Sequence, residues 1–125
     1  MSEKNKKQFG VWMDTRHATI VGRENTENGG FVILGHVENT GAGHDSHEKS
    51  SNNKEIGLTH KFFKEIAALM PNIDDLHVTG TGQIQEEFIN YLAETPQYKN
   101  AVTDESTSNK MSDESLVNYI EQHFK

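Results

Sequence analysis

The sequence predicts a single α/β domain built on a mixed five-stranded sheet. Three observations predict this class: the chain has 125 residues, short β-rich runs fill its first third, and apolar residues recur at helical spacing between further short runs after that. A chain of this length forms one core rather than two. We expect residues 1–8 to be a flexible N-terminal arm and residues 9–125 to be the domain.

The first three predicted strands follow one another with short turns between them. Residues 9–13 and 18–22 are β-rich runs separated by four polar residues, which is the length of a hairpin loop. A second turn covers residues 25–30, and residues 31–37 are the third run. Strands joined by such short connections pair antiparallel, so this part is expected to be a meander.

The rest of the chain alternates helices with short strands. Leu58, Phe62, Ile66 and Leu69 share one helix face, and Pro71 ends that helix. A strand over residues 76–79, a helix from Ile84 to near Thr95 and a strand over residues 101–103 are expected to follow. Ser112 is expected to cap the last helix, whose apolar stripe is Leu116, Ile120 and Phe124. The order β-β-β-α-β-α-β-α, with parallel pairing of the helix-separated strands, is typical of ribonuclease H-like folds.

Residues 40–55 (TGAGHDSHEKSSNNKE) contain almost nothing that a core could bury, which predicts a polar, mobile loop. His44 and His47 lie in it with Asp45 and Glu48 beside them, and His36 lies upstream. Such a group can bind zinc or nickel. Because no helix fixes the spacing and no complete ligand set is evident, we favour a solvated loop and assign no metal.

Composition limits the function classes. The net charge is −7, and the two halves differ: residues 1–60 carry −1 and residues 61–125 carry −6. Binding of nucleic acid by the whole surface is therefore disfavoured, whereas a local basic site in the first half is allowed. The chain has no cysteine, which excludes zinc–thiolate and thiol chemistry, and no apolar run approaches bilayer length. We expect a cytoplasmic protein without a membrane partner or a small-molecule cofactor.

Two further positions have both a structural and a functional interpretation. Gly80-Thr81-Gly82 follows a strand and precedes a helix, so its amides can hold an anion, but the same glycines suit a tight turn, and Glu86 and Glu87 would repel phosphate. Asp14 ends the first strand, where ribonuclease H-like nucleases place a Mg²⁺ ligand, and it also begins a turn that its side chain can cap. The turn interpretation is favoured at both positions.

Three segments together resemble a known family. They are the hairpin over residues 10–21, the glycine-bearing residues 41–44 ahead of a helix containing residues 60–64 (HKFFK), and the strand that runs into Gly80-Thr81-Gly82. In this order they are similar to the middle domain of the eukaryotic and archaeal peptide release factors and of Pelota. The family's Gly-Gly-Gln tripeptide is absent from residues 40–55, so the resemblance does not imply peptidyl-tRNA hydrolysis.

The resemblance implies a non-catalytic, translation-associated domain that contacts ribosomal RNA, tRNA or a ribosomal partner. Two alternatives stay open: a Mg²⁺-dependent nuclease or phosphoryl-transfer enzyme that uses Asp14 with Glu38, Asp75 or Asp104, and a protein–protein interaction module with an acidic surface. The candidate contact residues are Arg16, His17, Gly43, His44, His47, Lys49, Lys54, Lys61 and Lys64, with Gly80, Thr81 and Gly82 as the candidate anion turn.

Overall fold

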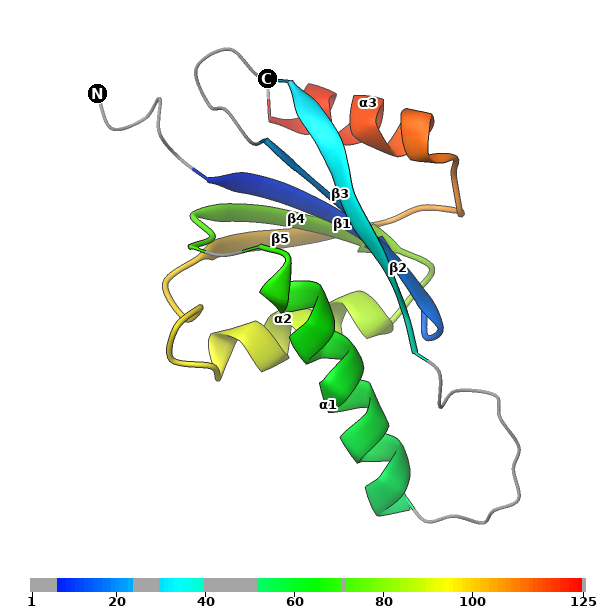
Figure 1. Ribbon diagram of the computed structural model, residues 1–125, viewed down its shortest axis with the longest axis vertical. Helices are drawn as coiled ribbons and strands as arrows, with labels where there is room; N and C mark the ends of the chain where they lie inside the picture. The colour runs from blue at the N-terminus through cyan, green and yellow to red at the C-terminus, as the bar shows by residue number, and fades with distance from the viewer. Residues whose placement is uncertain (1–6, 24–29, 40–51, 71, 125) are drawn as a thin grey trace.

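The computed structural model describes residues 7–23, 30–39, 52–70 and 72–124 (Figure 1). Its strands are β1 (Gln8–Met13), β2 (His17–Arg23), β3 (Phe31–Glu38), β4 (Asp75–Gly80) and β5 (Val102–Thr107). They form one sheet in the order β3-β2-β1-β4-β5. The β1–β2 and β2–β3 pairs are antiparallel, and the β1–β4 and β4–β5 pairs are parallel. The predicted mixed five-stranded sheet is confirmed.

Three helices cover the sheet: α1 (Asn52–Ala68), α2 (Ile84–Ala93) and α3 (Asp113–His123). In Figure 1, α1 and α2 lie on one face of the sheet and α3 lies on the other. Ser112 caps α3 as predicted, because its Oγ accepts a hydrogen bond of 3.2 Å from the Ser115 amide. None of the helices within the described residues has the length and apolarity that crossing a bilayer requires.

The central strand β1 contributes to both faces of the sheet. Phe9, Val11 and Met13 face α1 and α2, whereas Trp12 faces α3, because side chains alternate along a strand. The main cluster also contains Phe62, Phe63, Ile66, Met70, Leu76, Val78, Ile84, Phe88 and Leu92. The smaller cluster under α3 contains Trp12, Val21, Phe31, Leu116 and Ile120.

Several element bounds differ from the sequence prediction. Strand β5 runs to Thr107 rather than ending at residue 103, since pairing with β4 holds residues that have no apolar signal of their own. Helix α1 begins at Asn52, so residues 52–55, expected in the loop, are helical; this part of α1 extends beyond the sheet and needs no apolar stripe (Figure 1). Gln8, assigned to the arm, pairs with Asp75 in the sheet. The rest of the arm, residues 1–6, lies outside the described residues.

Gly80 occupies the tightest backbone approach near the end of β4. A Cβ at this position would lie 2.0 Å from the Met13 carbonyl oxygen, whereas one on Gly82 would meet nothing within 4 Å. Neither glycine has a left-handed backbone. The turn therefore uses Gly80 because β1 and β4 come close together, and the sequence-based reason, glycine's backbone freedom, is wrong for this turn.

We expect Gly80→Ala to lower the free energy of unfolding by about 3 kcal/mol or more, because the β1–β4 pair must separate to admit a methyl group. Gly82→Ala is the matched control and should change it by less than about 1 kcal/mol. Urea unfolding followed by circular dichroism measures both. Equal effects of the two substitutions would contradict the role given to the close approach.

Candidate functional site

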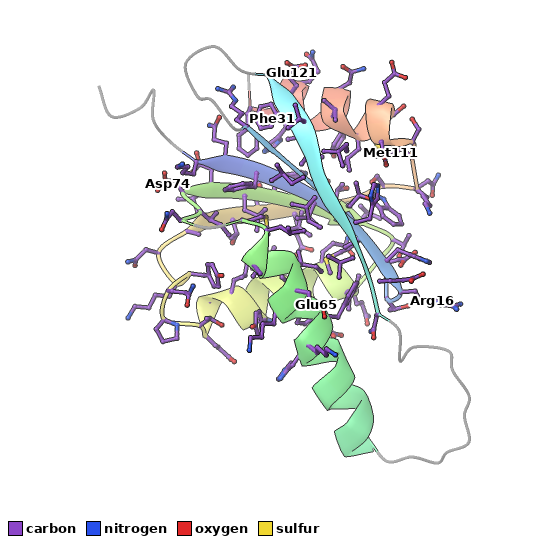
Figure 2. All side chains as sticks on the ribbon, viewed as in Figure 1. Arg16, Phe31, Glu65, Asp74, Met111 and Glu121 are labelled. Carbon is purple, nitrogen blue, oxygen red and sulfur yellow. The ribbon has the colours of Figure 1, made fainter. Side chains whose placement is uncertain are left out.

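The turn between β1 and β2 is held by the side chain of Asp14. Its Oδ1 accepts hydrogen bonds from the Arg16 amide at 2.8 Å and from the His17 amide at 2.7 Å. One carboxylate oxygen thus closes the turn, which confirms the turn interpretation of this residue. The Arg16 side chain points away from the sheet at the tip of the hairpin (Figure 2).

This hairpin tip is also joined to the end of β3. The Asn39 amide donates to the Arg16 carbonyl at 2.8 Å, and Asn39 Nδ2 donates to the Thr15 carbonyl at 3.3 Å. His17 lies between two carboxylates, with Nδ1 3.7 Å from Asp14 and Nε2 3.6 Å from Glu38. Residue 40, where the predicted polar loop starts, therefore directly follows a residue bonded to the hairpin tip.

The other candidate contact residues are only partly described. Lys61 and Lys64 are exposed on α1. Lys54 lies within α1, although its side chain is outside the description. Gly43, His44, His47 and Lys49 lie outside the described residues, and with them most of the metal group considered from the sequence. His36, the remaining member of that group, pairs with Asp113 at 3.0 Å.

The Gly-Thr-Gly turn already has a partner for one of its amides. Gln85, whose side chain is fully buried, accepts from the Gly82 amide at 3.1 Å through Oε1 and donates to the Ser106 carbonyl at 2.9 Å through Nε2. Glu86 and Glu87 occupy the first turn of α2. An anion bound at this turn would therefore lie beside two carboxylates, and the Gly82 amide is already bonded to Gln85.

The carboxylates named as possible Mg²⁺ partners of Asp14 lie at different levels of the sheet. Asp75 pairs with Gln8 at the start of β1, six residues from Asp14, which is about 20 Å along a strand. Asp104 pairs with His77, which lies opposite Gly10 in the middle of β1. Of the three, Glu38 alone shares a neighbour with Asp14, namely His17. A two- or three-carboxylate centre around Asp14 is not formed by these residues.

A different group of polar side chains lies on the α3 face of β4 and β5. The Ser106 Oγ is its centre, at 2.9 Å from His77 Nε2, 2.9 Å from Thr79 Oγ1 and 2.8 Å from the Tyr119 hydroxyl. Thr79 in turn bonds the Ser108 Oγ at 2.8 Å. Helix α3 packs its apolar stripe on the opposite half of this face, so β4 and β5 are left with a polar surface there.

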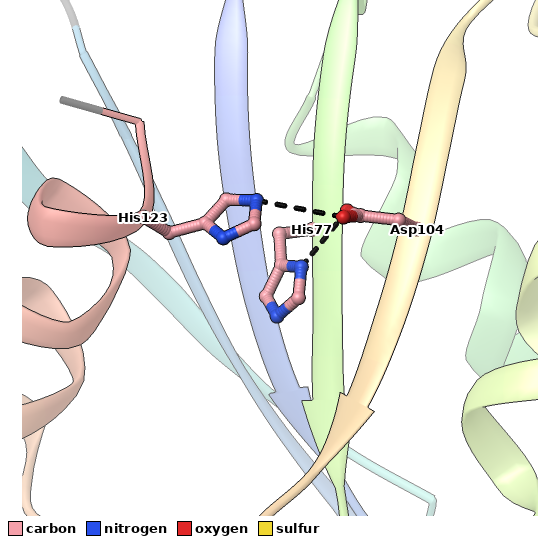
Figure 3. A group of neighbouring side chains, drawn as sticks. All are labelled: His77, Asp104 and His123. Atoms are coloured by element: carbon pink, nitrogen blue, oxygen red, sulfur yellow. Dashed lines mark hydrogen bonds and ion pairs between the residues drawn. The ribbon is translucent and has the colours of Figure 1, made fainter.

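At the edge of this network two histidines and a carboxylate converge (Figure 3). His77 Nδ1 is 2.8 Å from Asp104 Oδ1, and His123 Nε2 is 3.6 Å from Asp104 Oδ2. The two imidazole rings are tilted by 32° to one another, with their centroids 3.9 Å apart. His77 is buried, whereas the side chain of Asp104 is 59% exposed and that of His123 is 33% exposed. We call this group the histidine cluster.

Sequence reasoning did not find the histidine cluster. From the sequence, Asp104 is a candidate only as a partner of Asp14, and His77 lies in the strand predicted over residues 76–79. The three residues are separated by 27 and 19 positions, and they meet through the parallel β4–β5 register and the last turn of α3. A usable signal was present in the alternation of His77 with buried Leu76 and Val78, which places the histidine on the other face.

The fold is similar to that of solved structures. No protein-family model matches the sequence, and no curated protein matches it. Solved structures match the fold: the Pelota protein of Thermoplasma acidophilum has a TM-score of 0.60 at 17% identity, and Archaeoglobus fulgidus Pelota has 0.54 at 18% identity. An archaeal translation termination factor has 0.50 at 16% identity.

The chain has a Pelota-like fold. The matches cover 92%, 98% and 87% of this chain and 32%, 36% and 32% of the three structures, in the same order. The chain therefore spans about a third of the length of these proteins. The predicted resemblance to release factors and Pelota is confirmed for the Pelota-like fold, and at these identities it extends to the fold alone.

Asp14 offers a direct test of its structural role. Asp14→Ala removes the acceptor of two amides and should lower the free energy of unfolding by about 1–2 kcal/mol. Asp14→Asn keeps an acceptor oxygen in the same place and should cost less than about 1 kcal/mol. Urea unfolding with and without Mg²⁺ measures both. Stabilisation of the native chain by Mg²⁺, lost in Asp14→Asn, would instead assign the carboxylate to a metal centre.

Proposed function

We propose that this chain is a non-catalytic, translation-associated domain that contacts ribosomal RNA, tRNA or a ribosomal partner. The observation that carries the proposal is the Pelota-like fold, which covers most of the chain and which an archaeal translation termination factor shares. The proposed role is contact rather than catalysis because residues 40–55 lack the Gly-Gly-Gln tripeptide that release factors carry there.

The contact surface in this proposal is the hairpin tip together with residues 40–51. Three features support this surface. The Asn39–Arg16 hydrogen bond places Asn39, the residue that directly precedes residues 40–51, next to the tip. Arg16 is exposed with its charge directed to solvent (Figure 2). The first half of the sequence, which contains the hairpin and residues 40–51, carries −1, whereas the second half carries −6, so a local phosphate contact is less disfavoured in the first half.

Binding to purified ribosomal particles tests the proposal. The chain should sediment with the particles at low salt and separate from them at high salt, because phosphate contacts release counterions. Arg16→Glu should weaken binding and reduce the slope of log K against log salt by about 1. Replacing His44, His47 and Lys49 with serine should weaken binding as well.

Lys99→Glu is the matched control for the charge reversal. Lys99 is exposed between α2 and β5, at the end of the parallel strands opposite the hairpin tip, so its reversal should leave binding unchanged. Equal loss of binding in both variants would contradict the assigned surface. Sedimentation as a free protein at both salt concentrations would overturn the proposed function itself.

A further inference from the structure

The hydroxyl network provides a partner for one ring nitrogen of His77. Ser106 has one hydroxyl hydrogen, and Thr79 Oγ1 and the Tyr119 hydroxyl are both placed to accept it. When either of them accepts it, the bond of 2.9 Å between Ser106 Oγ and His77 Nε2 is donated by the histidine. A neutral imidazole has one N–H, so the remaining nitrogen, His77 Nδ1, presents a lone pair.

That lone pair faces a carboxylate. His77 Nδ1 and Asp104 Oδ1 are 2.8 Å apart, and both are acceptors when the neutral imidazole carries its hydrogen on Nε2. Two acceptors hold this separation only with a cation between them, which is either a second proton on the ring or a metal ion. His123 favours the metal ion, because a proton shared by His77 and Asp104 needs no third group, whereas a metal ion does.

The third group is placed as a metal ligand would be. His123 Nε2 points to the other oxygen of the same carboxylate at 3.6 Å, and the three ligand atoms lie within 4.8 Å of one another. Zinc bonds of about 2.0–2.1 Å in tetrahedral geometry place neighbouring ligand atoms about 3.3 Å apart. The two observed separations, 2.8 Å from His77 Nδ1 to Asp104 Oδ1 and 3.6 Å from His123 Nε2 to Asp104 Oδ2, bracket that value.

We propose that His77, Asp104 and His123 bind a zinc ion through His77 Nδ1, an Asp104 oxygen and His123 Nε2. Two imidazoles and one carboxylate are a donor set typical of zinc sites with an open position, whereas Mg²⁺ and Ca²⁺ prefer oxygen alone. Both Asp104 and His123 are partly exposed, so the fourth position faces solvent. The ion joins the last turn of α3 to the edge of the sheet.

The Ser106 hydroxyl has the role of an outer-shell partner in this site. Metal-binding histidines almost always donate their second N–H to an oxygen, which fixes the ring and its tautomer. His77 Nε2 does so to Ser106, and Tyr119 bonds the same hydroxyl at 2.8 Å. Burial of His77 then restricts the ring to one orientation, with Nδ1 directed at the site.

Zinc binding by the untagged full chain, after treatment with a chelator, tests the proposal. Calorimetric titration with zinc alone should give one tight site per chain. His123→Gln and Asp104→Asn, both at partly exposed positions, should weaken it by more than about 100-fold, since loss of an outer-shell partner alone costs about 10–100-fold. Ser106→Ala should fall within that 10–100-fold range. Circular dichroism checks that each variant is folded.

Two controls separate this site from the other histidines. His36→Gln removes a histidine that also pairs with a carboxylate on α3, Asp113, but that has no third ligand among the residues the structure describes. It should leave the zinc affinity unchanged. The double variant His44→Gln/His47→Gln should also leave it unchanged.

Long-range ¹H–¹⁵N spectra of the imidazole rings give an independent readout. Zinc should shift the resonances of His77 Nδ1 and His123 Nε2. Three results would overturn the proposal: no zinc binding by the native chain, loss of binding in the His44/His47 variant, or a proton retained on His77 Nδ1 with zinc present. The last would identify the cation as a proton. None of these results bears on ribosome binding, so the two proposals fail separately.

Discussion

Burial of β1 on both faces is the constraint on which the rest of the structure depends. Its neighbours differ in direction, antiparallel β2 on one side and parallel β4 on the other, so β1 joins the meander to the helix-separated strands. Each face must then be covered by helices, or apolar β1 side chains would be exposed to water. Gly10 makes the cover on the α3 side possible, since a Cβ there would lie 2.3 Å from a carbon of Ile120.

The position of α3 has a consequence for the other half of the same face. Its apolar stripe covers the region of Trp12, Val21 and Phe31, and only the side of the helix that bears Tyr119 and His123 reaches toward β4 and β5. The side chains of β4 and β5 on this face are therefore polar. His77 and Thr79 are buried, whereas Asp104 is exposed and Ser106 is partly exposed. Buried polar groups must be bonded, which is why the hydroxyls and imidazoles there form one connected network.

The order of the elements and the helix faces that cover the sheet could be predicted because both depend on local signals. Ser112 marks a helix start by its own chemistry, and the spacing of Leu116 and Ile120 marks the buried face. Strand β5 (VTDEST) was underestimated because its formation depends on hydrogen bonds to β4, which sequence periodicity does not report. The histidine cluster depends on strand register and on where α3 ends, so local alternation places His77 on the α3 face but does not bring the three residues together.

The network contains the residues of a Ser-His-Asp triad, and the tautomer proposed for zinc binding reverses the direction of its hydrogen bonds. In a triad the histidine donates through Nδ1 to the carboxylate and accepts the serine proton at Nε2. In the proposed tautomer the Ser106 proton goes to Thr79 or Tyr119, so His77 donates through Nε2 and directs its Nδ1 lone pair at Asp104. Ser106 also bonds Tyr119, which leaves its oxygen surrounded by partners. A serine held in this way is not activated as a nucleophile, whereas the same tautomer suits His77 to bind a cation. Proton direction, more than residue identity, decides which chemistry this site supports.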